Sequence, residues 1–115
     1  MISLLFFTAS APEGNDSPVN SKTLLLSYNA VSCNCAQWSA TNADKNKLTE
    51  YIYLERANSQ LIDANKLWDG EHLPLHVKVS GRYLQGVGVP KDYSQTKGKA
   101  EPARIFRYEK ITVLH

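Results

Sequence analysis

The sequence has few of the features that mark specialised proteins. It contains two cysteines, too few for a scaffold held by several disulfides and too few to complete a tetrahedral metal site. No stretch reaches the roughly 20 apolar residues of a membrane-spanning helix, so no transmembrane span is expected. There is no internal repeat and no low-complexity tract. The formal net charge is only +2, which by itself indicates no polyanionic partner.

What the sequence does contain is an ordinary globular composition. Of its 115 residues, 43% are hydrophobic and 21% are charged, which predicts one domain with a single core. The charges are divided unevenly: residues 1–74 carry five Lys or Arg against eight Asp or Glu, whereas residues 75–115 carry eight against three. If the C-terminal strands share a face, that face is positive and could attract an anionic ligand. The alternative is an ordinary solvated surface.

The clearest structural signal is the alternation over residues 73–83. The apolar positions of this stretch are every second residue, with Gly81 among them: Leu73, Leu75, Val77, Val79 and Tyr83. Successive side chains of a strand point to opposite faces, so the pattern predicts a strand with one buried and one solvated face. Gly81 predicts a bulge or a sharp bend, as in a curled sheet or small barrel.

Three further strands are predicted, over residues 23–31, 48–55 and 103–114. In the last of them the apolar phase slips, which predicts a bulge near Glu109. The connection of residues 85–102 is long for a compact domain, and such connections tend to be binding loops or mobile segments.

Residues 58–70 break the two-residue rhythm and predict a short helix. Leu61, Ala64, Asn65 and Trp68 recur at helical spacing. Asn58 or Ser59 is expected to cap its start and Gly70 to end it. Trp68 is the expected anchor of this helix against the sheet.

The order of these elements predicts a mostly β fold. It matches a small five-stranded OB-like Greek-key barrel with one short helix between the third and fourth strands. The first strand has two assignments: residues 2–8 supply it, or residues 22–38 form one long bent strand. The chain is expected to divide into residues 1–21, an N-terminal strand or signal-like segment plus linker, and residues 22–115, a single OB-like β-barrel domain.

Residues 1–11 have two interpretations. The apolar run ending in Ala9-Ser10-Ala11 resembles the core and cleavage site of a secretory signal, although no Lys or Arg precedes Lys22. The alternative is an N-terminal strand, with Ile2, Leu4 and Phe6 on one face.

Five segments carry a resemblance to known proteins: Cys33–Trp38, Tyr51–Glu55, Leu67–Gly70, Leu73–Gly81 and Ala103–Tyr108. Over residues 22–114 the chain resembles small uncharacterised bacterial envelope proteins, lipoprotein-like, with an OB-like barrel. The resemblance implies that fold and a periplasmic or cell-envelope (secreted) location. It implies no catalytic residues, because the family has no assigned activity. Ser10 stands where a lipid-bearing cysteine would be expected, which argues against lipid anchoring.

Cys33 and Cys35 are the sharpest chemical signal. In an extended strand their Cα atoms would lie about 6.6 Å apart, so a disulfide between them requires a bent backbone. The functional interpretations are a redox pair, a thiol trap, or two soft ligands for Cu(I) or Zn(II) that must recruit His72 or His76. The alternatives are packing beside Trp38 or a structural disulfide.

The candidate ligand-binding residues are aromatic and basic. An OB-type barrel presents rings on one face, where bases or sugars stack, and arginines would add positive charge. The predicted contact set is Tyr51, Tyr53, Tyr93, Arg82, Arg104 and Arg107, with Trp38 and Tyr83 extending the platform. The alternative is that the tyrosines shield the barrel exterior with their hydroxyls in water. The small charge and the implied location argue against nucleic acid.

No catalytic motif occurs: there is no G-x-S-x-G, no phosphate-cradling glycine loop and no histidine pair at metal spacing. The sequence therefore predicts no enzyme and no cofactor. It predicts a non-catalytic ligand- or protein-binding module of the bacterial cell envelope, with residues 85–102 and the aromatic and basic residues as its contact surface. The alternative is a thiol protein that uses Cys33 and Cys35, with His76, for soft-metal capture or redox exchange. The envelope ligand or partner protein and the oligomeric state are left open.

Overall fold

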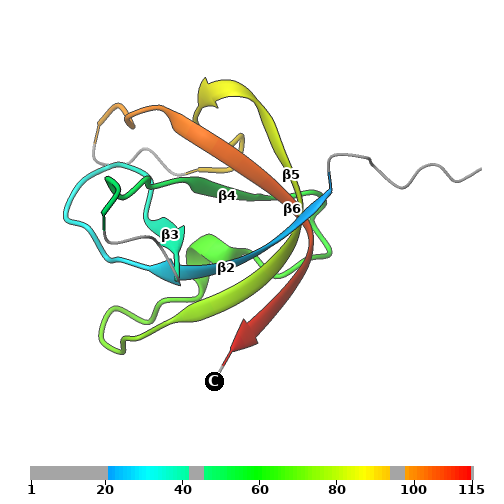
Figure 1. Cartoon of the computed structure of the whole chain (residues 1–115), viewed down its shortest axis with the longest axis horizontal. Coiled ribbons are helices and arrows are strands. Elements are labelled where there is room, and N and C mark those ends of the chain that lie inside the picture. Colours follow the sequence, from blue (N-terminus) through cyan, green and yellow to red (C-terminus); the bar gives the residue numbers. More distant parts are fainter. Residues whose placement is uncertain (1–20, 42–45, 94–97, 115) are drawn as a thin grey trace, which may run out of the picture.

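The computed structural model describes residues 21–41, 46–93 and 98–114, which form one sheet. Its elements are the strands β2 (Lys22–Tyr28), β3 (Trp38–Ala40), β4 (Tyr53–Arg56), β5 (His76–Gly88) and β6 (Ala103–Leu114), and the 3-10 helix η2 (Ala64–Lys66). The strand order is β3-β2-β5-β6-β4, with β4 parallel to β6 and all other pairs antiparallel (Figure 1). The predicted mostly β architecture is confirmed as a curled, mixed five-stranded sheet that forms a half-barrel.

The two edges of this sheet are joined at one point. Trp38, at the start of β3, and Ile52, just before β4, form an antiparallel bridge. The Trp38 N–H donates to the Ile52 carbonyl at 3.3 Å, and the Ile52 N–H donates to the Trp38 carbonyl at 2.8 Å. The curl therefore turns the apolar face of every strand towards a common interior.

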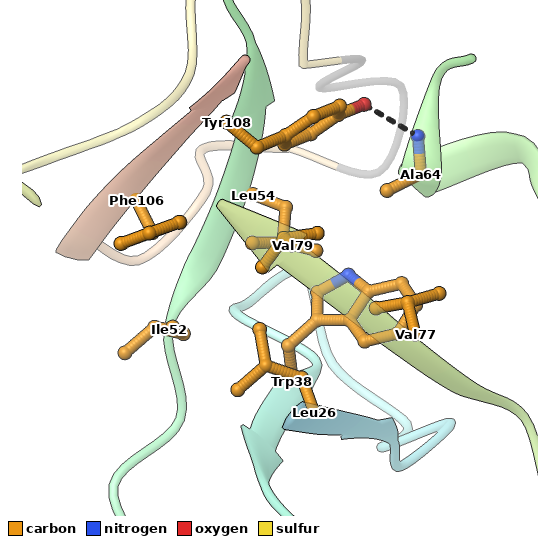
Figure 2. Close-up of a cluster of buried hydrophobic side chains, with 9 residues drawn as sticks. All are labelled: Leu26, Trp38, Ile52, Leu54, Ala64, Val77, Val79, Phe106 and Tyr108. Atoms are coloured by element: carbon orange, nitrogen blue, oxygen red, sulfur yellow. Dashed lines mark hydrogen bonds between the residues drawn. The ribbon is translucent and has the colours of Figure 1, made fainter. Parts of the chain in front are cut away.

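That interior holds the main core (Figure 2). Its buried members come from all five strands, from the bridge and from η2: Leu26, Trp38, Ile52, Leu54, Ala64, Val77, Val79, Phe106 and Tyr108. Trp38 is the largest of these side chains and is fully buried. Tyr28, Leu61 and Leu67 pack against the cluster from its rim.

A second, smaller core lies on the opposite face of the sheet. Tyr53 and Ile105 are buried there together with Ala36, and Tyr93 packs against them from the connection between β5 and β6. Because Tyr53 and Leu54 are both buried, β4 is covered on both faces. The connection that follows β5 is thus packed over the sheet where it is described, at residues 89–93 and 98–102.

The alternation predicted for residues 73–83 is confirmed by the complete burial of Val77 and Val79. The predicted ends of that strand were wrong. Leu73 is exposed and precedes a cis peptide bond to Pro74, and the strand begins at His76. At the other end β5 continues through residues 85–88, which were predicted as loop but extend the pairing with β6 as far as Gly88.

The predicted irregularities at Gly81 and near Glu109 are confirmed and are one feature. Ser80 pairs with Lys110 and Gly81 pairs with Tyr108, so Glu109 is the extra residue of a bulge. A Cβ at Gly81 would collide with the carbonyl oxygen of Arg107 and lie 2.8 Å from the Cα of Tyr108. Glycine therefore allows β6 to bend closely over β5.

The helix predicted over residues 58–70 was wrong. Only η2 forms, and Asp63, rather than Asn58 or Ser59, caps it by accepting a hydrogen bond from the Asn65 N–H. The Tyr108 hydroxyl binds the Ile62 carbonyl and accepts from the Ala64 N–H. These two backbone groups are therefore paired outside any α-helix, and the segment follows the sheet instead of coiling.

Other boundaries also differ from the prediction. The strand predicted over residues 23–31 ends at Tyr28. Residues 22–38 are not one long bent strand: they form β2 and a turn, and a second strand, β3, begins at Trp38. In place of the strand predicted over residues 48–55 there is the short β4, preceded by the bridge at Ile52, and Leu48 lies outside it and is 99% exposed. The expectations for residues 1–20 lie outside the described residues. Among those that are described, no helix is long and apolar enough to cross a membrane.

Candidate binding site

The turn between β2 and β3, residues 29–37, is organised by two amide side chains. The Asn29 Nδ2 donates to the Gln37 carbonyl at 2.8 Å and to the Ser39 Oγ at 2.9 Å. The Gln37 side chain lies inside the turn, where its Nε2 donates to the Val31 carbonyl at 2.9 Å and its Oε1 accepts from the Val31 N–H at 2.5 Å. This turn, called the 29–37 loop below, is therefore built around its own side chains.

Cys33 and Cys35 lie within this loop as a close, disulfide-bonded pair. Their Cα atoms are 5.3 Å apart and the backbone around them is bent, as a bridge at this spacing requires. Cys33 is exposed to solvent. Both the thiol and the structural interpretations are compatible with this arrangement.

His76 lies on β5, where its Nδ1 shares a 2.8 Å hydrogen bond with the Ser27 Oγ. His72 lies in an exposed turn, where the two oxygens of Asp69 bind its ring and backbone nitrogens. These hydrogen bonds hold the pKa of Asp69 well below its usual range. No cluster of three or more His, Cys, Asp or Glu side chains with metal-site geometry occurs in the described part of the chain.

The 29–37 loop is braced against the connection between β5 and β6. The Asn34 Nδ2 donates to the Gly98 carbonyl at 2.6 Å, and the Glu101 N–H donates to the Asn34 carbonyl at 3.0 Å. The Tyr93 hydroxyl donates to the Cys35 carbonyl at 3.2 Å. Segments far apart in sequence thus lie side by side at one end of the half-barrel, with the 29–37 loop in cyan and the residues before β6 in orange (Figure 1).

Two grooves flank the 29–37 loop. The first, called the aromatic groove, has a volume of about 430 Å³ and is lined chiefly by Tyr28, Trp68 and Tyr93 and by the amides of Asn34, Gln37 and Asn65. The second, called the cysteine groove, has a volume of about 260 Å³ and is lined by Cys33, Cys35, Tyr51 and residues 101–103. A third cavity, of about 420 Å³, lies away from the loop between β2 and residues 47–50 and is mainly aliphatic.

Aromatic contacts fix the walls of the aromatic groove. The Tyr28 ring lies 5.3 Å from the Trp68 ring and 5.2 Å from the Trp38 ring, measured between centroids. Tyr93 is held edge-on to Tyr53 at 5.0 Å. Burial raises the pKa of Tyr28, and the neighbouring Tyr93 raises it further; burial also raises that of Tyr93. Both hydroxyls therefore stay protonated at neutral pH.

The predicted tyrosines are brought to this end of the molecule but do not form one platform. Tyr51 is exposed and lines the cysteine groove. Tyr53 is only 1% exposed, and its hydroxyl donates to the Glu101 carbonyl at 2.5 Å, so its ring offers no face to a ligand. Tyr93 is half-buried and lines the aromatic groove.

Two of the predicted arginines, Arg82 and Arg107, are cross-strand partners on β5 and β6, and Arg104 interacts at a different place. The guanidinium of Arg104 lies 3.7 Å above the ring centroid of Tyr83 and pairs with Glu50 at 3.2 Å, at the aliphatic cavity. Arg107 pairs with the buried Glu55 at 2.7 Å. Arg82 projects into solvent from β5. None of the three arginines is among the residues that line the two grooves beside the 29–37 loop.

The aromatic groove depends on residues that the sequence analysis did not select: Tyr28, Asn34, Gln37, Asn65 and Trp68. Trp68 was predicted only as the anchor of the helix over residues 58–70, and it also lines this groove. The available signal was the density of amides around the cysteines, because Asn29, Asn34 and Gln37 occur within one short turn.

Comparison of the chain with protein-family models, with curated proteins and with solved structures found no match.

Proposed function

We propose that this chain is a non-catalytic ligand- or protein-binding module of the bacterial cell envelope, built on an OB-like barrel. Its contact surface is the end of the half-barrel where the 29–37 loop meets the β5–β6 connection. The observation that carries the proposal is the bracing of these two segments by Asn34 and Tyr93, with a groove on either side of the loop.

The strand connectivity supports the OB-like part of the proposal. With the Trp38–Ile52 bridge counted as a pairing, the strands follow one another around the sheet as β2, β3, β4, β6, β5 and back to β2. This order is that of a five-stranded, partly open barrel, and the one helical turn among the described residues lies between the third and fourth of these strands. OB-type barrels bind oligonucleotides and oligosaccharides with the loop between strands 1 and 2 and the loop between strands 4 and 5. The 29–37 loop and the β5–β6 connection are the corresponding segments.

Preorganisation supports a binding role. Ordering a flexible loop on association consumes part of the interaction free energy, and a loop that is already held avoids that cost. In the 29–37 loop, hydrogen bonds of the Gln37 and Asn34 side chains to other parts of the chain hold the backbone. Residues around the grooves are therefore positioned before a partner arrives.

The envelope location is supported by the resemblance described above and by the cysteine pair. Disulfides form and persist in oxidising compartments such as the periplasm and are rare in the cytosol. A bonded Cys33–Cys35 pair, one residue of which is exposed, is compatible with the periplasm.

The test is a chemical-shift map of the oxidised protein. Neutral and charged saccharides, short peptides, oligonucleotides and envelope extract are added in turn, and a true ligand is expected to shift Asn34, Tyr51 or Trp68. The variant Asn34→Ala should weaken binding of that ligand, because it removes the hydrogen bond to Gly98 and loosens the 29–37 loop. Asn58→Ala, in an exposed turn elsewhere, is the matched control. The proposal is rejected if no member of the panel changes the chemical shifts of residues around the 29–37 loop.

A second candidate function is thiol–disulfide exchange or Cu(I) capture by Cys33 and Cys35, with His76 as a further metal ligand. It is favoured by the exposure of Cys33, which a reductant or metal carrier can reach. The check is a thiol count before and after treatment with a dithiol, followed by Cu(I) titration of the reduced protein. This candidate is eliminated if the dithiol does not reduce the cysteine pair. It is also eliminated if the reduced protein neither binds Cu(I) nor reforms the disulfide when an oxidant is added.

A further inference from the structure

The aromatic groove has an unusual combination of neutral groups. Its walls include the rings of Tyr28, Trp68 and Tyr93, and its polar lining is provided mainly by three amide side chains. Among the residues that the structure describes, no Lys, Arg, His, Asp or Glu side chain lines it. The ligand that such a surface recognises is therefore uncharged, with both an apolar face and hydrogen-bonding groups.

Several hydrogen-bonding groups at this groove have no partner among the described residues. The Asn34 and Asn65 Nδ2 groups donate to the Gly98 and Leu54 carbonyls, which fixes both amide planes and leaves each Oδ1 available as an acceptor. The hydroxyl of Tyr28 is likewise unpaired, and the raised pKa of this group keeps it a donor. Three residues that line the groove thus each carry an oxygen with no partner among the described residues.

We propose that the aromatic groove binds the ring of a neutral saccharide, an inference that rests on the proposed binding function. The apolar C–H face of a pyranose would pack on Tyr28 and Trp68, whose rings lie 5.3 Å apart. Its hydroxyl groups would donate to the Asn34 and Asn65 oxygens. The groove volume of about 430 Å³ falls within the range of roughly 300–1,000 Å³ found for small-molecule sites.

The charge distribution opposes the other ligand classes. Arg104 and Arg107 are each paired with a glutamate at other sites, so neither faces the groove. A phosphate or carboxylate would find no cation among the described lining residues to offset its lost hydration. A purely aliphatic ligand would leave the polar half of the lining without partners.

The test is a titration of the oxidised full chain with neutral trisaccharides of glucose, mannose and N-acetylglucosamine, compared with an oligogalacturonate, a nucleotide and a neutral peptide. Binding is followed by amide chemical shifts and by the fluorescence of Trp68. At least one neutral saccharide is expected to shift Tyr28, Asn34 and Asn65. Tyr28→Phe, which removes only the hydroxyl, should lower the affinity for that saccharide about tenfold. Tyr83→Phe, whose ring lies at the aliphatic cavity, is the matched control and should not change it.

The outcomes separate this inference from the proposed function. If only the peptide, the nucleotide or the oligogalacturonate binds beside the 29–37 loop, the saccharide inference is overturned and the proposed binding function stands. The same holds if neutral saccharides bind at the cysteine groove and Tyr28→Phe has no effect. If neither the panel nor an envelope extract changes the amide chemical shifts around the 29–37 loop, both the saccharide inference and the proposed function are overturned.

Discussion

Glu55 shows how much one carboxylate does in this molecule. It is 4% exposed, its Oε2 accepts from the Nε and Nη2 of Arg107 at 2.7 Å each, and its Oε1 accepts from the Lys91 N–H at 3.0 Å. A single side chain thus ties β4 to β6 and holds the start of the β5–β6 connection. The same connection carries Tyr93, which forms one wall of the aromatic groove. The hydrogen bonds of Glu55 therefore also help to hold that wall in place.

Replacing Glu55 with glutamine is expected to lower the free energy of unfolding by about 2 kcal/mol. It keeps the volume but removes the charge that strengthens the bonds to Arg107, whose partial exposure moderates the loss. Urea unfolding measures the change. Glu50→Gln is the matched control, because its pair with Arg104 is exposed and should change stability by less than about 0.5 kcal/mol. Equal losses in the two variants would contradict the role assigned to Glu55.

At the scale of the elements, the bend in the β5–β6 pair is the most demanding feature. Ser80 and Gly81 pair with Lys110 and Tyr108 across the bulge at Glu109, and the strands approach too closely there for any side chain at position 81. Gly88 lies in the same strand, but a Cβ at that position would meet only the Ile105 Cδ1 at 3.7 Å.

Gly81→Ala should therefore destabilise the protein by about 3 kcal/mol or prevent folding, because the atoms in the way belong to the backbone. Gly88→Ala should stay within about 1 kcal/mol of the parent. Thermal and urea unfolding compare the two, and amide shifts of residues 107–110 report the displaced strand. The account of the bulge fails if the two alanines cost the same.

The elements that sequence reasoning found were those whose pattern is local. Two-residue alternation identified β5 and β6, and a slip in that alternation identified the bulge at Glu109. The helix over residues 58–70 was wrong because its competing partner is remote: the Tyr108 hydroxyl, on β6, binds backbone groups that a helix would need. The sequence of residues 58–70 does not predict that hydrogen bond. The extension of β5 through residues 85–88 was missed for the same reason, since it depends on pairing with β6.

The candidate site was predicted less well than the fold. Cys33, Cys35, Tyr51 and Tyr93 do gather at one end of the molecule, and the β5–β6 connection does contribute to it. Whether a tyrosine on the outer face is open or covered depends on what packs over it, and Tyr53 is covered by a segment distant in sequence. Arg107 was likewise assigned to a ligand although a buried partner, Glu55, already holds it.

For the whole molecule, burial of tyrosines predicts sensitivity to alkali. Five tyrosines have a raised pKa, with burial as the first cause in each: Tyr28, Tyr53, Tyr83, Tyr93 and Tyr108. For Tyr53, burial together with Tyr93 and Glu101 raises the pKa to about 12. In the unfolded chain these phenols ionise near pH 10. Above that pH the unfolded state loses protons that the folded state keeps, so stability falls.

The free energy of unfolding is therefore expected to be insensitive to these groups below about pH 10 and to decline between about pH 10 and 12. Urea unfolding at stepped pH measures the decline, with tyrosinate absorbance as a parallel probe. Tyr53→Phe should make the decline shallower, because one of the displaced phenols is gone. A decline of the same slope in that variant would show that Tyr53 is not among the groups responsible.

The position of β6 has a consequence for how the chain is made. β6 lies between β5 and β4, and it is the neighbour with which β4 pairs along its whole length. A ribosome releases β4 well before residues 103–114, so during translation β4 lacks its strand partner, although contacts such as the bridge at Ile52 and the bond from the Asn65 Nδ2 to the Leu54 carbonyl involve residues made earlier. The half-barrel consequently assembles after the polypeptide has been synthesised through β6, and the growing chain stays open and unassembled until then.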